Sequence, residues 1–334
     1  MCRWGPGCCS VNRKLIKEII MQENFRKDVL EGLSNKPQKK LSSKYFYDAT
    51  GDELFVKIMA LPEYYLTRAE MDIFQDKTSE LIAAMQLEKE EKYDIIELGA
   101  GDGTKTIHLL RELQLRKFSF EYYPVDISLN ALEGLENMLL KELPELKVKP
   151  MHMEYFQSLS RLKQDGNKKI ILFLGSNIGN MPDDEATEFI YQLGANMYPG
   201  DKLILGVDLT KPKELILPAY NDAQGITAAF NLNLLHRINR ELDGNFDVKE
   251  FEHYPVYDEN EGIAKSYLRS KRSQEVNVSG HTFFFTEGEL IHTEVSRKYN
   301  DSIIKKILSK TDITWVEKVT DSNNLFADYI LLRH

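Results

Sequence analysis

Short apolar runs alternate with amphipathic stretches through the middle of the chain. The runs have the length and composition of buried strands, at 93–98, 119–127, 147–152, 168–175 and 202–209. Between them, apolar residues recur at helical spacing over 104–115, 129–142 and 183–197. Strands that alternate with helices predict a parallel sheet covered by helices on both faces.

After the fifth run the pattern changes. Residues 210–242 have a largely helical pattern, and residues 246–296 alternate as antiparallel strands do. A helix over 300–310 and two strands over 314–321 and 325–333 follow. We therefore expect an α/β sheet domain that ends in a helix and a hairpin, with a second α+β substrate-binding domain inserted into it.

The chain before the sheet is expected to join the second domain. A helical pattern covers 15–33, a polar linker is expected at 36–44 (KPQKKLSSK), and aromatic residues crowd 45–74. Thr67 is placed to cap a helix that runs to about Met85. The expected bounds are an irregular leader at 1–12, substrate-binding segments at 13–66 and 210–298, and sheet-domain segments at 67–209 and 299–334.

Composition narrows the class of partner. The chain has 334 residues and is 42% hydrophobic, which suits about two domains. Its formal charge of −9 argues against nucleic acid as the main partner. No apolar run approaches the roughly 18 residues of a membrane span, and no signal peptide is recognisable. We expect a cytoplasmic, monomeric protein that acts on a small molecule.

The three cysteines, Cys2, Cys8 and Cys9, all lie at the start of the chain. The elements that follow contain none, so no disulfide links them, as suits a reducing compartment. The sequence assigns this leader no role. No cluster of residues has the spacing of metal ligands, and we expect no metal.

The strongest local motif is Tyr93–Lys105, YDIIELGAGDGTK, in which an apolar run breaks into Gly99, Gly101 and Gly103. A strand, a glycine-rich turn and a helix allow a nucleotide to approach the backbone and the helix N-terminus. The spacing lacks the third glycine of G-x-G-x-x-G, which disfavours a nicotinamide dehydrogenase. The spacing found here, together with the expected antiparallel strand at the end of the sheet, resembles class I S-adenosylmethionine methyltransferases.

Polar residues follow the next strands. Asp126 lies at the tip of the second strand, where the position favours contact with ribose hydroxyls over an ordinary helix cap. Glu154 and Tyr155 follow the third strand, where a carboxylate can meet an adenine amino group. After the fourth strand, Asn180 can accept a hydrogen bond from an amine or simply form a turn. We interpret Asn177 as a turn residue.

Several longer motifs occur in a defined order. They are KYFYDATGDELF with LPEYYLTRAE, IIELGAGDGTKT, YYPVDIS, LGSNIGN, AYNDAQGITAAFNLNLLHRINREL and IHTEVSRKY. Together they resemble the histidine Nα-methyltransferases of ergothioneine biosynthesis, a family that also holds fungal dimethylallyltryptophan N-methyltransferases. The resemblance covers nearly the whole chain from about residue 37. It implies S-adenosylmethionine as methyl donor and L-histidine as acceptor, with the trimethylated betaine hercynine as product.

The resemblance also implies roles for single residues. The cofactor contacts are Gly99, Lys105, Asp126, Glu154 and Tyr155, although the family often has aspartate and phenylalanine as the last pair. The amine is held by Asn180, and the substrate carboxylate by Tyr47 and Tyr220. The imidazole is held by Tyr64, Glu294 and Ser296. Catalysis is implied for Asn180, which orients the amine, and for Tyr47, whose hydroxyl helps to remove protons.

The residue pattern bears on some of these roles. Glu294 and Ser296 are two apart on an expected strand, so they share a face and can bind both imidazole nitrogens. Without the resemblance, a solvent-exposed strand face is the simpler interpretation. We expect Phe55 in the core, and Tyr47 and Tyr64 on the wall of a pocket that holds a quaternary ammonium cation.

Other functions stay open at this point. The acceptor can be another amino acid or an indole-bearing amine, although Glu294 disfavours an indole, which offers no acceptor. The chain can also bind a cofactor without turnover, or be a dehydrogenase. The sequence leaves the number of methyl groups undetermined. His253 and five further histidines, His108, His152, His236, His281 and His334, we interpret as surface or satisfied core residues, and nothing assigns a role to His292.

Overall fold

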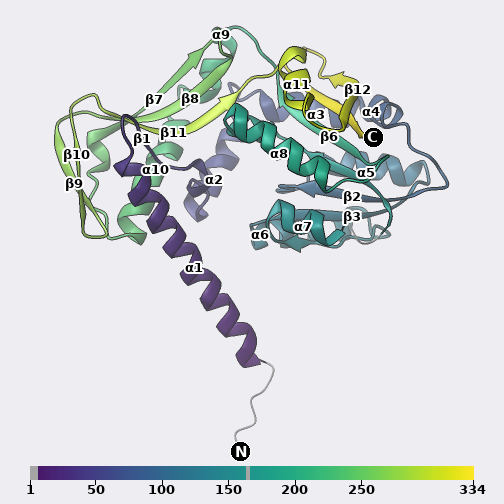
Figure 1. Ribbon diagram of the computed structural model, residues 1–334, viewed down its shortest axis with the longest axis horizontal. Coiled ribbons are helices and arrows are strands. Elements are labelled where there is room, and N and C mark those ends of the chain that lie inside the picture. Colours follow the sequence, from purple (N-terminus) through teal and green to yellow (C-terminus); the bar gives the residue numbers. More distant parts are fainter. Residues whose placement is uncertain (1–6, 163–165) are drawn as a thin grey trace, which may run out of the picture. The chain divides into compact units, whose positions relative to one another are not determined.

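The structure, a computed structural model, describes residues 7–162 and 166–334 (Figure 1). The described chain divides into two compact units. Unit 1 takes the chain up to Tyr64, Lys213–Asp258 and Ala264–Val295, and unit 2 takes Tyr65–Pro212, Glu259–Ile263 and Ser296–His334. The expected bounds after 66, 209 and 298 lie two or three residues from these changes, and the short return at 259–263 was not predicted.

Unit 2 is built on a seven-stranded sheet of order β12-β13-β6-β5-β2-β3-β4. The strands are β2 (Lys92–Leu98), β3 (Ser119–Asp126), β4 (Met151–His152), β5 (Lys168–Phe173), β6 (Lys202–Asp208), β12 (Ile313–Thr320) and β13 (Phe326–Arg333). The central strands pair in parallel, and β13 runs antiparallel between β6 and β12. This order confirms the predicted class I Rossmann-like sheet with a closing hairpin.

Helices cover both faces of this sheet. They are α3 (Leu66–Asp76), α4 (Thr78–Met85), α5 (Thr106–Leu115), α6 (Leu129–Glu142), α7 (Tyr155–Leu162), α8 (Asp183–Ala195) and α11 (Asp301–Leu308). One core cluster packs α7, α8 and α11 against the sheet, and another packs α3, α4, α5 and α6 against it. The prediction of one helix from 67 to 85 is wrong, because Lys77, at φ −118° and ψ 18°, leaves the helical conformation. The sequence analysis also missed α7.

Unit 1 combines helices with two small sheets. Its helices include α1 (Gly7–Ser34), α2 (Ala49–Met59), α9 (Lys213–Ile216) and α10 (Ile226–Glu241). The larger sheet has the order β1-β11-β8-β7, and β9 and β10 form an antiparallel hairpin. These strands are β1 (Lys39–Lys40), β7 (Phe251–Asp258), β8 (Ile263–Ser270), β9 (Gln274–Val278), β10 (His281–Phe285) and β11 (Leu290–Arg297). The apolar side chains of β7 to β11 form one core with α1, α2 and α10.

The predicted irregular leader is wrong over residues 7–12. Helix α1 begins at Gly7, so Cys8 and Cys9 lie in a helix, whereas Cys2 falls outside the described residues. The sequence from Cys8 to Glu31 contains neither glycine nor proline, so nothing in it interrupts a helix.

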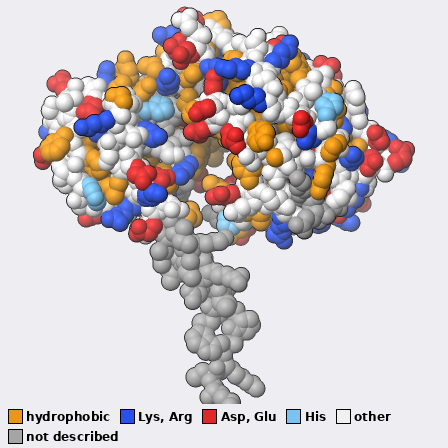
Figure 2. All heavy atoms as spheres, viewed as in Figure 1, with side chains coloured by type: hydrophobic (Ala, Val, Ile, Leu, Met, Phe, Trp, Pro, Cys, Tyr) orange, Lys and Arg blue, Asp and Glu red, His pale blue; other side chains and the backbone are white. Residues whose placement is uncertain are grey.

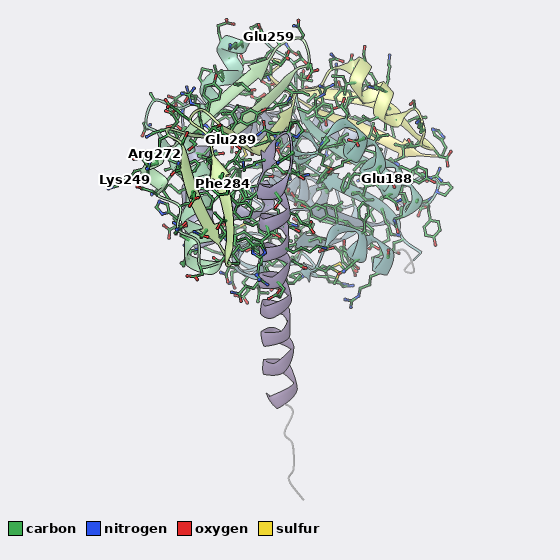
Figure 3. The ribbon with its side chains drawn as sticks, turned by 60° about the vertical axis from the view of Figure 1, so that its left-hand side comes forward. Glu188, Lys249, Glu259, Arg272, Phe284 and Glu289 are labelled. Atoms are coloured by element: carbon green, nitrogen blue, oxygen red, sulfur yellow. The ribbon has the colours of Figure 1, made fainter. Side chains whose placement is uncertain are left out.

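The segment predicted as a polar linker at 36–44 contains β1, which pairs in parallel with β11. Lys39 forms an ion pair with Glu289 and donates to the Phe284 carbonyl at 3.0 Å. Figure 3 labels Phe284 and Glu289. Leu41 is 4% exposed and belongs to the core of unit 1, so the segment packs instead of being solvated.

The surface carries both signs of charge. On the face that Figure 2 shows, acidic and basic side chains are interspersed. Within the described residues, no helix has the length and apolar character needed to cross a membrane. In the same part of the chain, no three histidine, cysteine or acidic residues are grouped as metal ligands would be.

Candidate cofactor and substrate site

The glycine-rich turn after β2 closes tightly over the end of β3. The N–H groups of Gly99 and Ala100 donate to the Val125 carbonyl at 2.8 and 3.2 Å. Gly99 has a φ of 78°, and a Cβ there would lie 2.9 Å from the Tyr155 hydroxyl. Only glycine fits this position without strain, so the turn keeps its backbone accessible beside Tyr155.

Asp126 ties this turn to the tip of β3. Its Oδ2 accepts from the Gly101 N–H at 3.1 Å, and its Oδ1 accepts from the Ser128 N–H at 2.8 Å. The N-cap of α6 is Ser128, whose side chain accepts from the Ala131 N–H. A carboxylate offers about four acceptor sites, so this half-buried group retains capacity for two hydroxyl donors.

Tyr155 meets the turn from the start of α7. Its ring packs against Phe173 and Phe189, with centroids 5.8 and 6.3 Å away. Burial, followed by the charge of Asp126, raises the pKa of Tyr155 to about 12, so its hydroxyl stays neutral. Glu154 precedes it and its side chain is exposed. The structure thus brings Gly99, Asp126 and Tyr155 together and leaves Glu154 at the solvent edge.

Lys105, just before α5, pairs its ammonium group with the carboxylate of Glu70 from α3. The side chains are 22% and 1% exposed, respectively. Burial opposes the charged lysine, but the attraction of Glu70 outweighs it and raises the pKa of Lys105. The lysine is therefore a fixed, protonated group at the start of α5, and its partner Glu70 was missed by the sequence analysis.

Asn180 ends a short 3₁₀ turn, η3 (Asn177–Asn180), that follows β5. The turn is held from two sides, because the Ser176 hydroxyl accepts from the Asp208 N–H at 3.0 Å and the Tyr299 hydroxyl donates to the Ile178 carbonyl at 3.2 Å. Asn180 itself is exposed. An exposed amide at the end of a fixed turn can orient a ligand's amine.

Asn177 lies beside the glycine-rich turn. Its Nδ2 would be 3.5 Å from a Cβ at Gly99. We interpreted Asn177 as a turn residue, and it does begin η3. Its side chain nevertheless faces the glycine-rich turn, a proximity that has no signal in the sequence beyond its place after the fourth strand.

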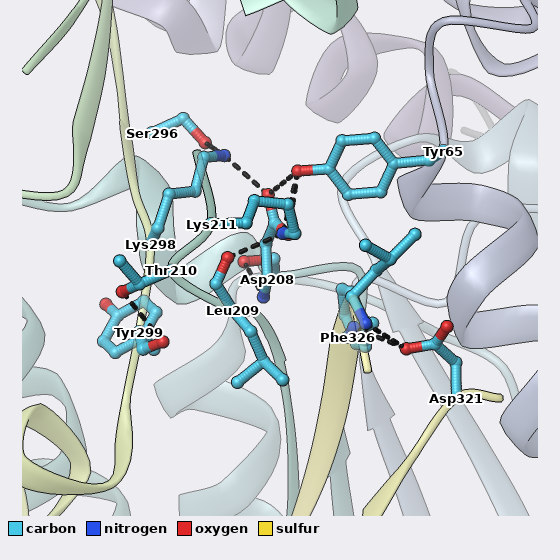
Figure 4. Close-up of polar contacts among 12 residues, drawn as sticks. Tyr65, Asp208, Leu209, Thr210, Lys211, Ser296, Lys298, Tyr299, Asp321 and Phe326 are labelled. Atoms are coloured by element: carbon cyan, nitrogen blue, oxygen red, sulfur yellow. Dashed lines mark hydrogen bonds and ion pairs between the residues drawn. The ribbon is translucent and has the colours of Figure 1, made fainter. Parts of the chain in front are cut away.

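Ser296 lies in β11, where the chain passes from unit 1 into unit 2. Its Oγ accepts from Lys298 Nζ at 2.8 Å. Lys298 also pairs with Asp208 Oδ2 at 2.8 Å, and both of those side chains are 0% exposed. Figure 4 shows that Tyr65 and Lys211 converge on the same carboxylate. Ser296 is therefore held by a buried ionic network of unit 2.

Tyr47 and Tyr64 belong to an aromatic cluster of unit 1. Phe55 contacts both, with ring centroids 5.5 Å from Tyr47 and 6.3 Å from Tyr64. Phe230 of α10 packs against Tyr47 at 5.7 Å. Tyr47 is 45% exposed. Phe55, which we predicted in the core, is only partly buried and packs against the core of unit 1. The cluster can thus present tyrosine hydroxyls on an apolar base.

Tyr220 ends the 3₁₀ turn η4 (Leu217–Tyr220) and is 8% exposed. Its carbonyl accepts from His253 Nε2 at 2.8 Å. Burial lowers the pKa of His253, and its buried Nδ1 has no hydrogen-bond partner. The interpretation of His253 as a surface or satisfied core residue is therefore wrong: it is a neutral, partly satisfied ring that supports the Tyr220 turn.

Glu294 lies on β11, half-buried. The Ser266 hydroxyl of the neighbouring strand β8 donates to its Oε2 at 3.4 Å. The alternate residues Ile291 and Thr293 are buried at 0% and 2% exposed, so Glu294 points to the other face of the sheet. A partly buried carboxylate on that face can accept a hydrogen bond from a ring N–H.

Comparison with known proteins finds a matching family model and several similar proteins. A family model described as histidine-specific methyltransferase, SAM-dependent, matches residues 25–333. Histidine N-alpha-methyltransferase of Mycolicibacterium smegmatis is 34% identical over 313 residues, 93% of this chain and 95% of that protein. The protein of the same name from Mycobacterium tuberculosis is 34% identical over 305 residues, 91% of this chain and 93% of that protein. Ergothioneine biosynthesis protein 1 of Schizosaccharomyces pombe is 31% identical over 88% of this chain and 39% of that protein.

Proposed function

Because the chain belongs to the family of S-adenosylmethionine-dependent, histidine-specific methyltransferases, we propose that it methylates the α-amino group of L-histidine to the trimethylated betaine hercynine, the first step of ergothioneine biosynthesis. The observation that carries this proposal is the match over residues 25–333, which spans both units. We also propose that the enzyme is a monomer and that it uses no metal.

The residues around the glycine-rich turn suit the methyl donor. Gly99 leaves space that a Cβ would fill, and Asp126 retains acceptor capacity for a ribose diol. We assign the cofactor contacts to Gly99, Lys105, Asp126, Glu154 and Tyr155. When bound, S-adenosylmethionine supplies a methyl group on an already activated sulfonium, so the protein's task is mainly alignment.

For the acceptor we assign Asn180 to the amine, Tyr47 and Tyr220 to the carboxylate, and Tyr64, Glu294 and Ser296 to the imidazole. The attacking amine must be neutral, and an α-amino group titrates near pH 8 or somewhat higher. A fraction is therefore neutral at cellular pH, and a strong general base is not required. We assign Asn180 Oδ1 to accept one amine hydrogen and direct the lone pair, and the hydroxyl of Tyr47, a residue that is 45% exposed, to pass protons to water.

A mass-spectrometric assay tests this function. We expect incubation with S-adenosylmethionine and L-histidine to give mass increases of about 14, 28 and finally 42, one methyl group for each step. A panel with L-tryptophan, a prenylated tryptophan and the other amino acids covers the alternative acceptors. Methylation of an indole-bearing amine in preference to histidine would support the alternative substrate and contradict the proposal.

Replacement of Asp126 by alanine is expected to weaken S-adenosylhomocysteine binding about tenfold, because hydrogen bonds to a charged carboxylate are lost. The matched control is Asp102→Ala in the same turn. Asp102 is exposed and accepts hydrogen bonds from the N–H and hydroxyl groups of Thr104 in the same turn, so cofactor affinity should stay unchanged. Calorimetry on both variants measures the difference, and wild-type affinity in Asp126→Ala would remove the ribose assignment.

A further inference from the structure

One carboxylate joins three elements of unit 2. Glu70 of α3 is 1% exposed. Its Oε2 pairs with Lys105 at the start of α5, and its Oε1 accepts from the Gly175 N–H at 2.7 Å, just past the end of β5. The glycine-rich turn leads into α5, and η3 follows β5. Because Glu70 holds a residue at each of these places, it fixes the spacing of the two segments.

A second carboxyl group lies beside Glu70. Asp328 of β13 is 0% exposed, and within the described part of the chain neither of its oxygens has a hydrogen-bond partner. A Cβ on Gly206 of β6 would lie 2.5 Å from Glu70 Oε1 and 3.0 Å from Asp328 Oδ1. The two carboxyl groups therefore occupy the space that the missing side chain of Gly206 leaves.

Burial and the neighbouring charge of Glu70 favour the neutral form of Asp328. Burial, followed by the negative charge of Glu70, raises the pKa of Asp328 well above its usual value, and Lys105 only partly opposes this. A neutral carboxyl costs far less to bury than an unpaired carboxylate. It still leaves an unsatisfied polar group in the core, which is rare and calls for an explanation.

The other acid near Lys105 is already satisfied. Glu97 of β2 accepts from the Thr106 hydroxyl at 2.7 Å and from the Tyr122 hydroxyl. Burial raises the pKa of Glu97 to about 7, and the charges of Lys105 and Glu70 act on it in opposite directions. Of the three acids whose charges act on Lys105, Glu70 and Glu97 have hydrogen-bond partners, whereas Asp328 has none among the described residues.

We propose that Glu70 is a positioning residue that holds Lys105 and Gly175 at the cofactor site, and that Asp328 stands behind it as a second counter-ion for Lys105. The inference rests on the assignment of Lys105 to the cofactor in the proposed function. In the native protein Glu70 carries the charge. When that charge is removed, Asp328 releases its proton to solvent and takes over the pairing with Lys105.

The two carboxyl groups should therefore substitute for one another. Glu70→Gln keeps an oxygen that accepts from Gly175, and it loses only the charge. We expect about threefold weaker S-adenosylhomocysteine binding in Glu70→Gln and less than about twofold in Asp328→Asn. The double variant should bind S-adenosylhomocysteine about a hundredfold more weakly, well beyond the product of the single effects, because substitutions within one ionic network have non-additive effects. Calorimetry measures all three, and effects that simply multiply would overturn the proposal.

A spectroscopic readout separates this role from a purely structural one. Isotope-edited infrared spectroscopy detects the carbonyl band of a neutral aspartic acid. We expect this band in the wild type, and its loss both in Asp328→Asn and in Glu70→Gln, where Asp328 ionises. A neutral-acid band that persists in Glu70→Gln would overturn the proposal, whether or not the double variant folds.

Two controls complete the design. Asp201, which directly precedes β6, is also 0% exposed, and its carboxylate accepts hydrogen bonds from the backbone N–H groups of Lys169 and Tyr198. Asp201→Asn should lower thermal stability without changing cofactor affinity. Lys105→Met tests the underlying assignment: unchanged cofactor affinity there would remove Lys105 from the site and the inference with it, while histidine methylation in the wild type would still stand.

Discussion

Glu294→Ala is expected to weaken L-histidine binding about a hundredfold while S-adenosylhomocysteine affinity stays at the wild-type value. A site that hydrogen-bonds a substrate group loses most of its selectivity when one buried partner is removed, since the remaining polar atoms are left unpaired. Glu294 is half-buried on the face of β11 opposite the core residues Ile291 and Thr293. Its charge makes it the strongest acceptor assigned to the imidazole.

Calorimetry with histidine and with S-adenosylhomocysteine, measured separately, checks this prediction. Glu294→Gln keeps an acceptor oxygen without the charge and should show an intermediate loss. The matched control is Glu252→Ala on β7, whose carboxylate is 40% exposed and pairs with Arg269. That change should affect neither ligand. Unchanged histidine affinity in Glu294→Ala would show that the imidazole is held elsewhere, even if the enzyme methylates histidine.

Asp208→Asn is expected to reduce the free energy of unfolding by about 3–5 kcal/mol, the usual cost of breaking a buried ion pair. The Asp208 carboxylate accepts from Tyr65 Oη at 2.8 Å and pairs with both Lys298 and Lys211, and those two lysine side chains are 0% and 5% exposed (Figure 4). The substitution leaves two ammonium groups in the interior without the charge that they share.

Urea unfolding monitored by circular dichroism measures this effect. Glu142→Gln serves as the control, because the Glu142 carboxylate is 45% exposed and pairs with Arg111 at the surface. A surface pair contributes less than about 1 kcal/mol. Replacing Lys298 by methionine in the Asp208→Asn background should recover part of the loss. Equal stabilities of Asp208→Asn and Glu142→Gln would mean that the network contributes little to the fold.

The prediction of the sheet succeeded because its signals are local. Each buried strand is a short apolar run, so the order of strands from β2 to β6 could be predicted without knowing any contact. A helical pattern was recognised in every connection between these strands except the one from β4 to β5, where α7 was missed. The glycine-rich turn is local for the same reason. Gly99, Gly101 and Gly103 all have positive φ, which glycine adopts without penalty.

The errors arose where packing overrides the local pattern. The stretch 36–44 is polar and basic, yet Leu41 docks in a core and the strand β1 pairs with β11, about 250 residues later. The break at Lys77 has no glycine or proline to signal it. His253 could be assigned to the surface or to a satisfied core only by guesswork, since its unpartnered Nδ1 depends on residues from another element.

The class of fold, the glycine-rich motif and the family could be predicted from the sequence, because they depend on residue order, on spacing and on backbone conformations that single residues impose. Which charges meet depends on how the chain folds. Glu70 lies 105 positions from Gly175, and Tyr65 lies 143 positions from Asp208. No periodicity links such pairs. They meet because the ends of β5, β6 and β13 and the helices above them bring buried charges together, where low polarity makes each pairing strong and each unpaired group costly.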